Sequence, residues 1–457
     1  MSPQLTHNDQ SSTPPCYDPC GLERVQTDRH DWLVVDAWRD RILGPVAPDW
    51  FALGADPRAE RAKEGAGRVV WRVQLDGCVV YAKVFEAQGL LQAVKRWALG
   101  DPARREMRSG HRAERGGVAV VRFVAAGVDR RRRWRSVLVS EGITDAVALT
   151  EAWHESVAGL SGTARRRAVE RLAEPVAHLY AGAHHNGFVD LDGHPNNVLV
   201  FGDASQRLHA VFVDLHAARL SSSPVSRRRV ATALGQLEHV FRRTASRSER
   251  LRFLRRYLGL RGMSPPHFGD RELRCLVCSV LAARARQARR LARTRDSRLR
   301  RDGKYFATVR LGGGWTAKVA LALERRHLFA ELSVPDRARE QWVELLGGAI
   351  ARSCAHGAPA NVAAPGIRCL VHRAGPVVMR LGWTLGGSPA RAAFERCHRL
   401  RHRDVAAPLV LGYAERRRAG LIDAAIEILP RDPHLEALAE APTDPRFAPA
   451  TDRPPEG

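Results

Sequence analysis

Two neighbouring segments give the strongest indication of the fold: GFVDLDGHPNNVLV (187–200) and, ten residues later, VFVDLHAARL (211–220). Asp192 precedes Asn197 by five residues, and an apolar, strand-like run begins directly after the asparagine. If the two apolar runs pair as a hairpin, Asn197 and Asp214 lie on one side of a cleft, where both can reach one Mg²⁺. A nearby carboxylate such as Asp192 can orient an acceptor hydroxyl, so the pattern predicts a phosphoryl-transfer site.

The sequence before this stretch predicts a small β-rich lobe. RVVWRVQL (68–75) and CVVYAKVF (78–85) are separated by Asp76-Gly77, which is a strong hairpin signal. The second run carries Lys83, an uncommon choice for an apolar strand in a chain with five lysines. DPARREMRSGHRAERG (101–116) reads as a helix opened by Asp-Pro and closed by glycine, and strand-like runs follow at 118–127 and 136–143.

From about residue 150 the pattern becomes helical, with apolar residues at three- and four-residue spacing up to Gly187 and arginine-rich helices from 226 to 300. The chain order is therefore a small β-rich lobe (61–145) and then a larger helical lobe (146–302). This order predicts an α+β, two-lobed protein-kinase-like fold.

The wording of the motifs adds a resemblance. The D-x-x-x-x-N spacing followed by V-D-L-H resembles the catalytic loop and the metal-binding motif of protein kinases. The fuller pattern H-x-x-G-F-V…D-x-H-P-x-N-V-L-V is similar to the lipopolysaccharide kinase family, which includes Kdo and heptose kinases. DPARREMRSGHRAERGGV and LRFLRRYLGLRG (251–262) also resemble that family, so the likeness covers about residues 60–305.

The resemblance implies an enzyme that uses ATP and Mg²⁺ to phosphorylate a sugar hydroxyl. Asp192 would accept or orient the proton of that hydroxyl, and Asn197 and Asp214 would bind Mg²⁺. Lys83 would contact the phosphates of ATP, and Glu106 would pair with Lys83 from the helix.

Two departures from the kinase pattern stand out. Asp190-Leu191-Asp192 replaces His-Arg-Asp, and the added carboxylate would either raise the pKa of Asp192 or act as another metal ligand. No Gly-x-Gly-x-x-Gly loop is present; Gly65 and Gly67 in KEGAGRVV are the nearest substitute for a cover over the phosphates.

The charge of the chain leaves two interpretations open. The formal charge is +24 and nearly all of it comes from arginine, so either the composition is biased throughout or the protein approaches an anionic partner. The clusters at 130–135 and 284–301 are the best candidates for a basic surface. We expect a sugar or glycolipid substrate and contact with an anionic membrane, and not a nucleic acid partner.

No apolar run is long enough for a membrane span, and the N-terminus lacks the pattern of a secretory signal. We therefore expect a cytoplasmic protein, with peripheral association at the inner face of the cytoplasmic membrane.

Cysteine and histidine give weaker signals. Cys275 and Cys278 form an isolated CxxC, whose apolar neighbours favour core thiols over a metal site. His184 and His185 are expected to pack or to cap a helix, whereas His194 is a candidate for substrate contact.

A second similarity lies near the C-terminus. Residues 388–430 align with 101–143, and five identities share one offset: Pro389, Ala390, Arg391, His398 and Arg399 against Pro102, Ala103, Arg104, His111 and Arg112. Later in the alignment, Glu427 falls opposite Glu141 after a one-residue gap. The run of matches predicts a second, partial copy of the small lobe.

The second copy is expected to be non-catalytic. Ala393 stands at the position of Glu106, and the best match to Lys83 is Arg380 in VVMRLGW. Lys318 is another cation, but it precedes the matched helix by too long a stretch. This lobe would dock on the first domain or bind a partner.

The predicted organisation is a disordered tail (1–30), a lead-in segment (31–60), the kinase-like domain (61–302), the degenerate second small lobe (303–440) and a disordered tail (441–457). The expected function is ATP- and Mg²⁺-dependent phosphorylation of a lipopolysaccharide-type or other lipid-linked glycan. A pseudokinase scaffold is the alternative. A protein Ser/Thr kinase fits less well, because no Ala-Pro-Glu signature follows Asp214 before residue 230.

Overall fold

The structure is a computed structural model. It describes Cys16, Tyr17 and residues 22–430, except 66, 88–99, 133, 262–269, 304, 324–325, 328–339, 341, 349–361, 365–366, 404 and 406. The chain divides into two compact units, Met1–Ala283 and Arg284–Gly457. The predicted C-terminal tail at 441–457 lies outside the described residues.

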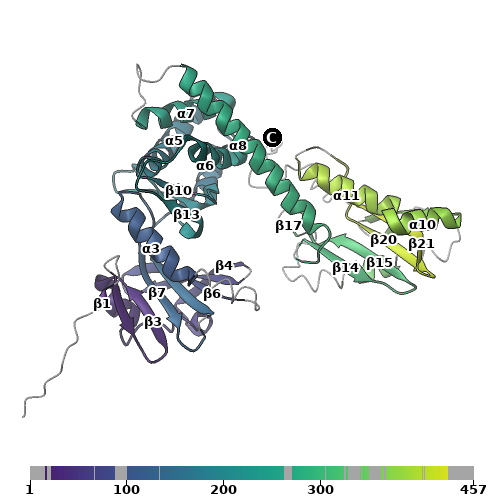
Figure 1. The fold of residues 1–457 in the computed structure, drawn as a ribbon, viewed down its shortest axis with the longest axis horizontal. Coiled ribbons are helices and arrows are strands. Elements are labelled where there is room, and N and C mark those ends of the chain that lie inside the picture. The colour runs from purple at the N-terminus through teal and green to yellow at the C-terminus, as the bar shows by residue number, and fades with distance from the viewer. Residues whose placement is uncertain are drawn as a thin grey trace, which may run out of the picture. The chain divides into compact units, whose positions relative to one another are not determined.

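The first unit begins with an antiparallel sheet of eight strands in the order β1-β2-β3-β7-β8-β6-β5-β4 (Figure 1). Its strands are β1 (Cys16–Tyr17), β2 (Glu23–Gln26), β3 (His30–Val34), β4 (Ala59–Gly65), β5 (Arg68–Leu75), β6 (Cys78–Glu86), β7 (Phe123–Asp129) and β8 (Arg135–Glu141). Helix α3 (Pro102–Arg115) connects β6 to β7 and contacts β7 and β8. Five strands in the order β4-β5-β6-β8-β7 with this helix form the small lobe of a kinase-like fold.

Local sequence explains where α3 begins and why it lies so close to the sheet. The Asp101 carboxylate accepts a hydrogen bond from the Arg104 backbone N–H at 3.0 Å, and proline occupies the first helical position. Gly110 faces Phe123: a Cβ at this glycine would lie 2.2 Å from the Phe123 ring. Glycine therefore allows the helix to approach β7.

The prediction of a disordered tail to residue 30 is wrong for residues 22–30. β2 pairs with β3 and β3 pairs with β7, so this segment extends the sheet. The lead-in segment likewise provides β3, the short helices η1 (Asp36–Trp38), α1 (Arg39–Leu43) and η2 (Leu53–Ala55), and the buried side chains of Trp32, Trp38 and Trp50. Because β2 is a short strand with exposed alternate residues, its sequence reads as polar.

The larger lobe of the first unit is mainly helical. Its helices are α4 (Leu149–Val157), α5 (Gly162–His185), α6 (Arg227–Phe241), α7 (Arg247–Leu260) and the start of α8 (Asp270–Arg298). Two antiparallel pairs carry the motifs: β10 (Phe188–Asp190) pairs with β13 (Ala218–Leu220), and β11 (Val198–Gly202) pairs with β12 (Leu208–Phe212). β9 (Val147–Ala148) pairs with β11. The short helices η3 (Pro195–Asn197) and η4 (Leu215–Ala217) lie beside these strands in the chain.

Several side chains outside the site are now placed. His184 is buried, its Nδ1 lies 2.8 Å from the Tyr257 hydroxyl, and burial lowers its pKa to about 3, so its role is packing. Cys275 and Cys278 are exposed on α8, so the expectation of core thiols is wrong. Their apolar neighbours had suggested burial, but these two positions face solvent.

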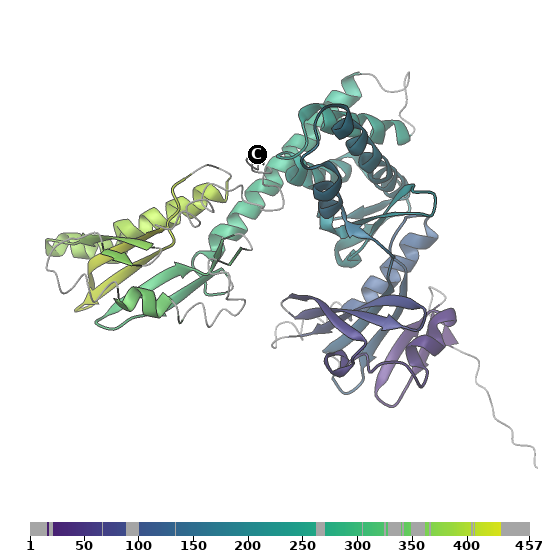
Figure 2. The ribbon, with the colours of Figure 1, turned by 180° about the vertical axis from the view of Figure 1, so that it is seen from behind.

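The second unit contains a six-stranded antiparallel sheet in the order β14-β15-β20-β21-β19-β18. Figure 2 shows this unit in green and yellow. The strands are β14 (Phe306–Arg310), β15 (Trp315–Ala320), β18 (Val362–Ala364), β19 (Ile367–Arg373), β20 (Gly412–Arg418) and β21 (Leu421–Pro430). Helices α10 (Val377–Gly386) and α11 (Pro389–Arg401) connect β19 to β20, and a short pair, β16 (Ala322–Leu323) with β17 (Arg326–His327), follows β15. In chain order and pairing, this sheet repeats β2-β3-β7-β8-β6-β5.

Contacts around the helices support the likeness between the two sheets. His111 Nε2 on α3 lies 2.9 Å from the Phe123 carbonyl oxygen, and His398 Nε2 on α11 lies 2.9 Å from the Val410 carbonyl oxygen. Both pairs span twelve residues. The Ser388 hydroxyl also accepts from the Arg391 N–H, as Asp101 accepts from Arg104.

Strand register corrects two of the matches made from sequence. If Val410 is the counterpart of Phe123, Tyr413 is the counterpart of Ala126. Ala126 pairs with Leu138 and Leu138 with Lys83, just as Tyr413 pairs with Glu427 and Glu427 with Leu370. Leu370, and not Arg380, therefore stands at the position of Lys83, because Arg380 lies on α10. By the same register, Glu427 corresponds to Leu138 and not to Glu141. The alignment made from sequence was out of register here, because β8 and β21 differ in length.

Lys318 has a different position again. It lies on β15, where its Nζ is 2.5 Å from Asp302 Oδ1. β15 corresponds to β3, so Lys318 is not a counterpart of Lys83.

Candidate active site

Three elements of the first unit meet at Lys83. The Lys83 ammonium lies 3.1 and 3.0 Å from the two carboxylate oxygens of Glu106, and 2.7 Å from Asp214 Oδ1. Lys83 comes from β6 of the small lobe, Glu106 from α3, and Asp214 from the turn after β12 in the larger lobe. The structure thus joins residues that are 131 positions apart in the sequence into one ion-pair network.

Glu106 is the most enclosed member of this network, with 2% of its side chain exposed. Burial raises the pKa of Glu106, and the Lys83 ammonium opposes that increase. A carboxylate that is so well buried is stable in its charged form only with a paired cation. Glu106 therefore fixes the position of the Lys83 ammonium.

Asp214 has an unusual backbone and three cationic neighbours. Its φ of 58° lies in the left-handed region, which is sparsely populated by residues other than glycine. Beside the Lys83 contact, Oδ1 lies 2.7 Å from His216 Nδ1, and Oδ2 lies 3.2 Å from the Arg68 guanidinium. Although burial opposes it, the His216 hydrogen bond, Lys83 and Arg68 together hold the pKa of Asp214 below its ordinary value.

The loop between β10 and β11 carries Asp192 and Asn197. The Asp192 side chain is 64% exposed, so its carboxylate is open to a substrate. Asn197 Nδ2 donates to the Asp192 backbone carbonyl at 3.1 Å. Because the amide nitrogen makes this bond, the amide oxygen is oriented away from the carbonyl and remains an acceptor for a cation.

The buried carboxylate of Asp190 holds the start of this loop by a hydrogen bond. It is 5% exposed, and its Oδ1 accepts a hydrogen bond from the Asp192 backbone N–H at 2.9 Å. Burial raises the pKa of Asp190 to about 6, while the Asp192 amide works against that increase. The structure thus shows the added carboxylate holding the backbone at Asp192.

His216 links the two halves of the site. Its Nε2 lies 3.9 Å from Asp192 Oδ2, and its Nδ1 contacts Asp214. The hydrogen bond that His216 Nδ1 donates to the Asp214 carboxylate raises the pKa of His216, and burial opposes this. In its protonated form, a histidine between the two carboxylates reduces their mutual repulsion.

The hairpin of β4 and β5 contributes an arginine to the same face of the sheet as Lys83. Val70 pairs with Lys83, and Arg68 lies two residues before Val70, so alternation places Arg68 and Lys83 on one face. Arg68 follows Gly65 and Gly67 directly, and Gly67 has a φ of 72°, which glycine adopts without strain. Arg68 thus lies where the hairpin ends beside Asp214.

Arg68 and His216 were not identified from the sequence. The sequence held a signal for each. Arg68 lies two residues before Val70, so both side chains lie on one face of a strand, and His216 is the last residue of V-D-L-H. Neither signal is informative until the register and the lobe contact are known. His194, a candidate for substrate contact, caps η3 by accepting from the Asn196 N–H at 3.2 Å.

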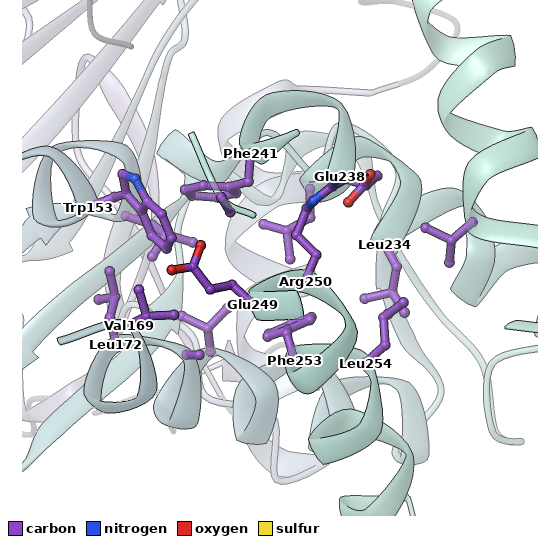
Figure 3. Close-up of a pocket in the computed structure, with 16 residues that line it drawn as sticks. Trp153, Val169, Leu172, Leu234, Glu238, Phe241, Glu249, Arg250, Phe253 and Leu254 are labelled. Atoms are coloured by element: carbon purple, nitrogen blue, oxygen red, sulfur yellow. Dashed lines mark hydrogen bonds and ion pairs between the residues drawn. The ribbon is translucent and has the colours of Figure 1, made fainter. Parts of the chain in front are cut away.

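A cavity of about 80 Å³ lies elsewhere in the larger lobe, between α4, α5, α6 and α7 (Figure 3). Its wall is mostly apolar, with Trp153 and Phe241 at one side and the Arg250–Glu238 ion pair among the few polar groups. None of the predicted site residues lines it. The cavity is therefore separate from the ion-pair network.

The donor atoms at the network fit a hard cation. In the part of the chain that the structure describes, no cluster of three His, Cys, Asp or Glu side chains could hold a metal ion by itself. Mg²⁺ commonly takes one or two protein oxygens and completes its shell with water and phosphate. The Asp214 carboxylate and the Asn197 amide oxygen match that requirement.

Comparison with known proteins agrees with this geometry. Residues 68–257 match the family model described as lipopolysaccharide kinase (Kdo/WaaP) family. No curated protein matches the chain at a significant level.

In the described part of the chain, no helix combines the length and apolarity that a bilayer span requires.

Solved structures give two similar folds. One, described as "WaaP in complex with acyl carrier protein", is 22% identical, covers 57% of this chain and 98% of its own, and has a TM-score of 0.39. The other is the kinase domain of a Toxoplasma gondii rhoptry antigen, 12% identical, with 49% and 83% coverage and a TM-score of 0.32. The resemblance predicted from the sequence is confirmed over residues 68–257, which form a kinase-like phosphotransferase domain similar to the lipopolysaccharide kinase (Kdo/WaaP) family.

Proposed function

We propose that the first unit transfers the γ-phosphoryl group of ATP, with Mg²⁺, to a hydroxyl of a lipopolysaccharide-type or other lipid-linked sugar. The observation that carries the proposal is the contact of Lys83 with both Glu106 and Asp214 across the two lobes. This contact brings a phosphate-binding cation next to a metal-binding carboxylate, as phosphoryl transfer requires. The family match supports the sugar acceptor.

The roles proposed for the residues follow from their positions. Lys83, held by Glu106, would bind the phosphates, and Asp214 with Asn197 would hold Mg²⁺, which neutralises charge on the phosphates. Asp192, with its exposed carboxylate, would orient the acceptor hydroxyl and take its proton as the new phosphate ester bond forms. Asp190 would keep the Asp192 backbone in place through its hydrogen bond.

Arg68 would compensate for the missing glycine-rich loop. Its guanidinium lies 3.2 Å from Asp214 Oδ2, and its side chain is 35% exposed, so it has room to move. A phosphate group offers arginine the same bidentate geometry as a carboxylate. We propose that Arg68 exchanges Asp214 for a phosphate of ATP, which would also release Asp214 for Mg²⁺.

The substrate assignment implies a place of action. A lipid-linked glycan and ATP meet at the cytoplasmic face of the membrane, so we propose that the protein works there as a peripheral enzyme. The pseudokinase alternative keeps one supporting observation, because both oxygens of Asp214 are engaged by protein cations.

The test has two stages. First, a thermal-shift titration with Mg-ATP should stabilise the wild type and not Asp214→Ala. Second, γ-labelled ATP is incubated with the protein and a membrane glycolipid extract, and the label should appear in a glycolipid. Glu174→Gln, which removes a surface carboxylate paired with Arg256, is the matched control and should behave as wild type. Binding without any transfer of label would favour the pseudokinase.

A further inference from the structure

The second unit carries a helix whose apolar face points into solvent. On α10, the side chains of Val377, Val378, Leu381 and Leu385 are 66%, 80%, 48% and 80% exposed. At 3.6 residues per turn, these four positions fall within one face of the helix. No residue of this ten-residue helix is buried. The usual amphipathic arrangement, in which the apolar face covers the core, is reversed.

The orientation of α10 is fixed by contacts at both of its ends. The Ile422 backbone N–H donates to the Thr384 hydroxyl at 2.9 Å, and the Ala374 N–H donates to the Asp423 carbonyl at 3.0 Å. These bonds hold the helix along the start of β21, which it contacts. The apolar face is therefore presented outward by the fold.

Arginines lie in α10, just before it, and in the turn that contacts its C-terminal end. Arg373 and Arg380 lie in or next to α10, and Arg416, Arg417 and Arg418 lie at the β20–β21 turn, beside the residues that anchor the helix. The acidic residues next to these arginines are Asp423, which pairs with Arg416 and Arg418, and the buried Glu415, which accepts from the Ser388 N–H. Arg417 and Arg418 are exposed, and Ile422, which pairs with Arg417, contacts α10 at Thr384, so the turn beside this end of the helix presents arginine to solvent.

The chemistry of this surface selects its occupant. Single exposed apolar side chains are ordinary, but a contiguous apolar face indicates an interaction site. A helix with aliphatic residues on one side and arginine around it suits the boundary between acyl chains and anionic headgroups. At ten residues, α10 is far too short to span a bilayer.

We propose that α10 and the β20–β21 turn form a docking surface for an anionic lipid bilayer. Val377, Val378, Leu381 and Leu385 insert among the acyl chains, and the arginines at the turn contact phosphate headgroups. This surface lies in the second unit and needs neither ATP nor the residues of the ion-pair network. It gives the non-catalytic sheet a role of its own.

The test is vesicle flotation of the full chain. We compare phosphatidylcholine vesicles with vesicles that contain about 30% phosphatidylglycerol, a composition that gives a strongly negative surface. The variants are Val378→Asp with Leu385→Asp, Arg417→Gln with Arg418→Gln, and the control Val46→Asp, which changes a side chain that is 68% exposed in the first unit. The substituted side chains on the apolar face of α10 are exposed, so the melting temperature of the double aspartate variant should match that of the wild type.

The wild type and Val46→Asp should bind the anionic vesicles at least about tenfold more than the neutral ones, and the double aspartate variant should lose about tenfold. The arginine variant should bind less and show a weaker dependence on salt. Wild-type protein that does not float with anionic vesicles would overturn the proposal. Unchanged vesicle binding by the double aspartate variant would also overturn it. So would a wild-type dimer that binds no vesicles and that the double aspartate substitution dissociates.

The experiment is independent of the proposed catalysis. Label transfer to a detergent-dispersed glycolipid should be the same in the wild type and in the double aspartate variant. Loss of vesicle binding with retained transfer supports the docking surface. Absence of transfer in every variant, with vesicle binding intact, would refute the proposed reaction and leave the docking surface standing.

Discussion

Replacing Lys83 by methionine tests the network through the charge of Glu106. Methionine keeps the unbranched apolar stem of the side chain as far as the ε position but leaves a carboxylate that is 2% exposed without its cation. Glu106 would then bind a proton on folding, since burial already raises its pKa from 4.5. Taking up that proton at pH 7 costs up to about 3 kcal/mol, from about 1.4 kcal/mol for each pH unit above 4.5.

The same reasoning fixes how the cost depends on pH. A group with a raised pKa in the folded protein loses its stabilising contribution as pH rises through that pKa. The penalty of Lys83→Met should therefore fall from up to about 3 kcal/mol at pH 7 to about 1 kcal/mol at pH 5. Lys83→Met with Glu106→Gln has no buried carboxylate at this position, so it should regain most of the stability at pH 7.

Hydrogen exchange of the α3 amides measures this penalty in the first unit separately from the second. Transfer activity should fall about a hundredfold or more in both variants, since both lack the ammonium. Lys318→Met is a matched control, because Lys318 pairs with Asp302 in the other sheet; it should leave α3 exchange and activity unchanged. A penalty that is equal at pH 5 and pH 7 would show that Lys83→Met loses stability through packing and not through protonation of Glu106.

Three further predictions concern the site and the repeated sheet. Arg68→Ala should weaken Mg-ATP binding about tenfold in calorimetry; unchanged affinity would remove Arg68 from the phosphate site. Asp214 has a lowered pKa, so its stabilising contribution is present above its ordinary pKa of 3.8 and is lost below it. The difference in melting temperature between wild type and Asp214→Asn should therefore shrink from pH 7 to pH 3, and a constant difference would contradict this. His111→Ala and His398→Ala should each cost about 1–3 kcal/mol, in the first and second unit respectively, as followed by exchange at Phe123 and Val410; a variant that affects neither strand would argue against equivalent contacts.

Much of the first unit could be predicted because its local signals agree. The runs 68–75 and 78–85 alternate, are separated by Asp-Gly, and form β5 and β6. The Asp-Pro start of α3 has the expected cap. The order of Asp192, Asn197 and Asp214 before and after the β11–β12 hairpin was enough to predict that they lie near one another.

What could not be predicted depends on tertiary register. Arg68 becomes informative only when Val70 is known to pair with Lys83. Arg380 looked like the counterpart of Lys83 because it follows an apolar run, but that run is the exposed helix α10. Residues 22–30 read as a polar tail, because the alternate residues Arg24 and Gln26 of β2 are exposed and its buried position is the charged Glu23. The roles of the site residues remain predictions.

Asp192 is proposed to act in the transfer step and the Lys83–Asp214 contact in nucleotide binding, and one rate comparison separates these two roles. Transfer of the γ-phosphoryl group to the glycolipid is measured for wild type and Asp192→Asn at saturating Mg-ATP. We expect the turnover of Asp192→Asn to be lower by a factor of about 10²–10⁴, with Mg-ATP affinity unchanged. Equal turnover in the two proteins would contradict it.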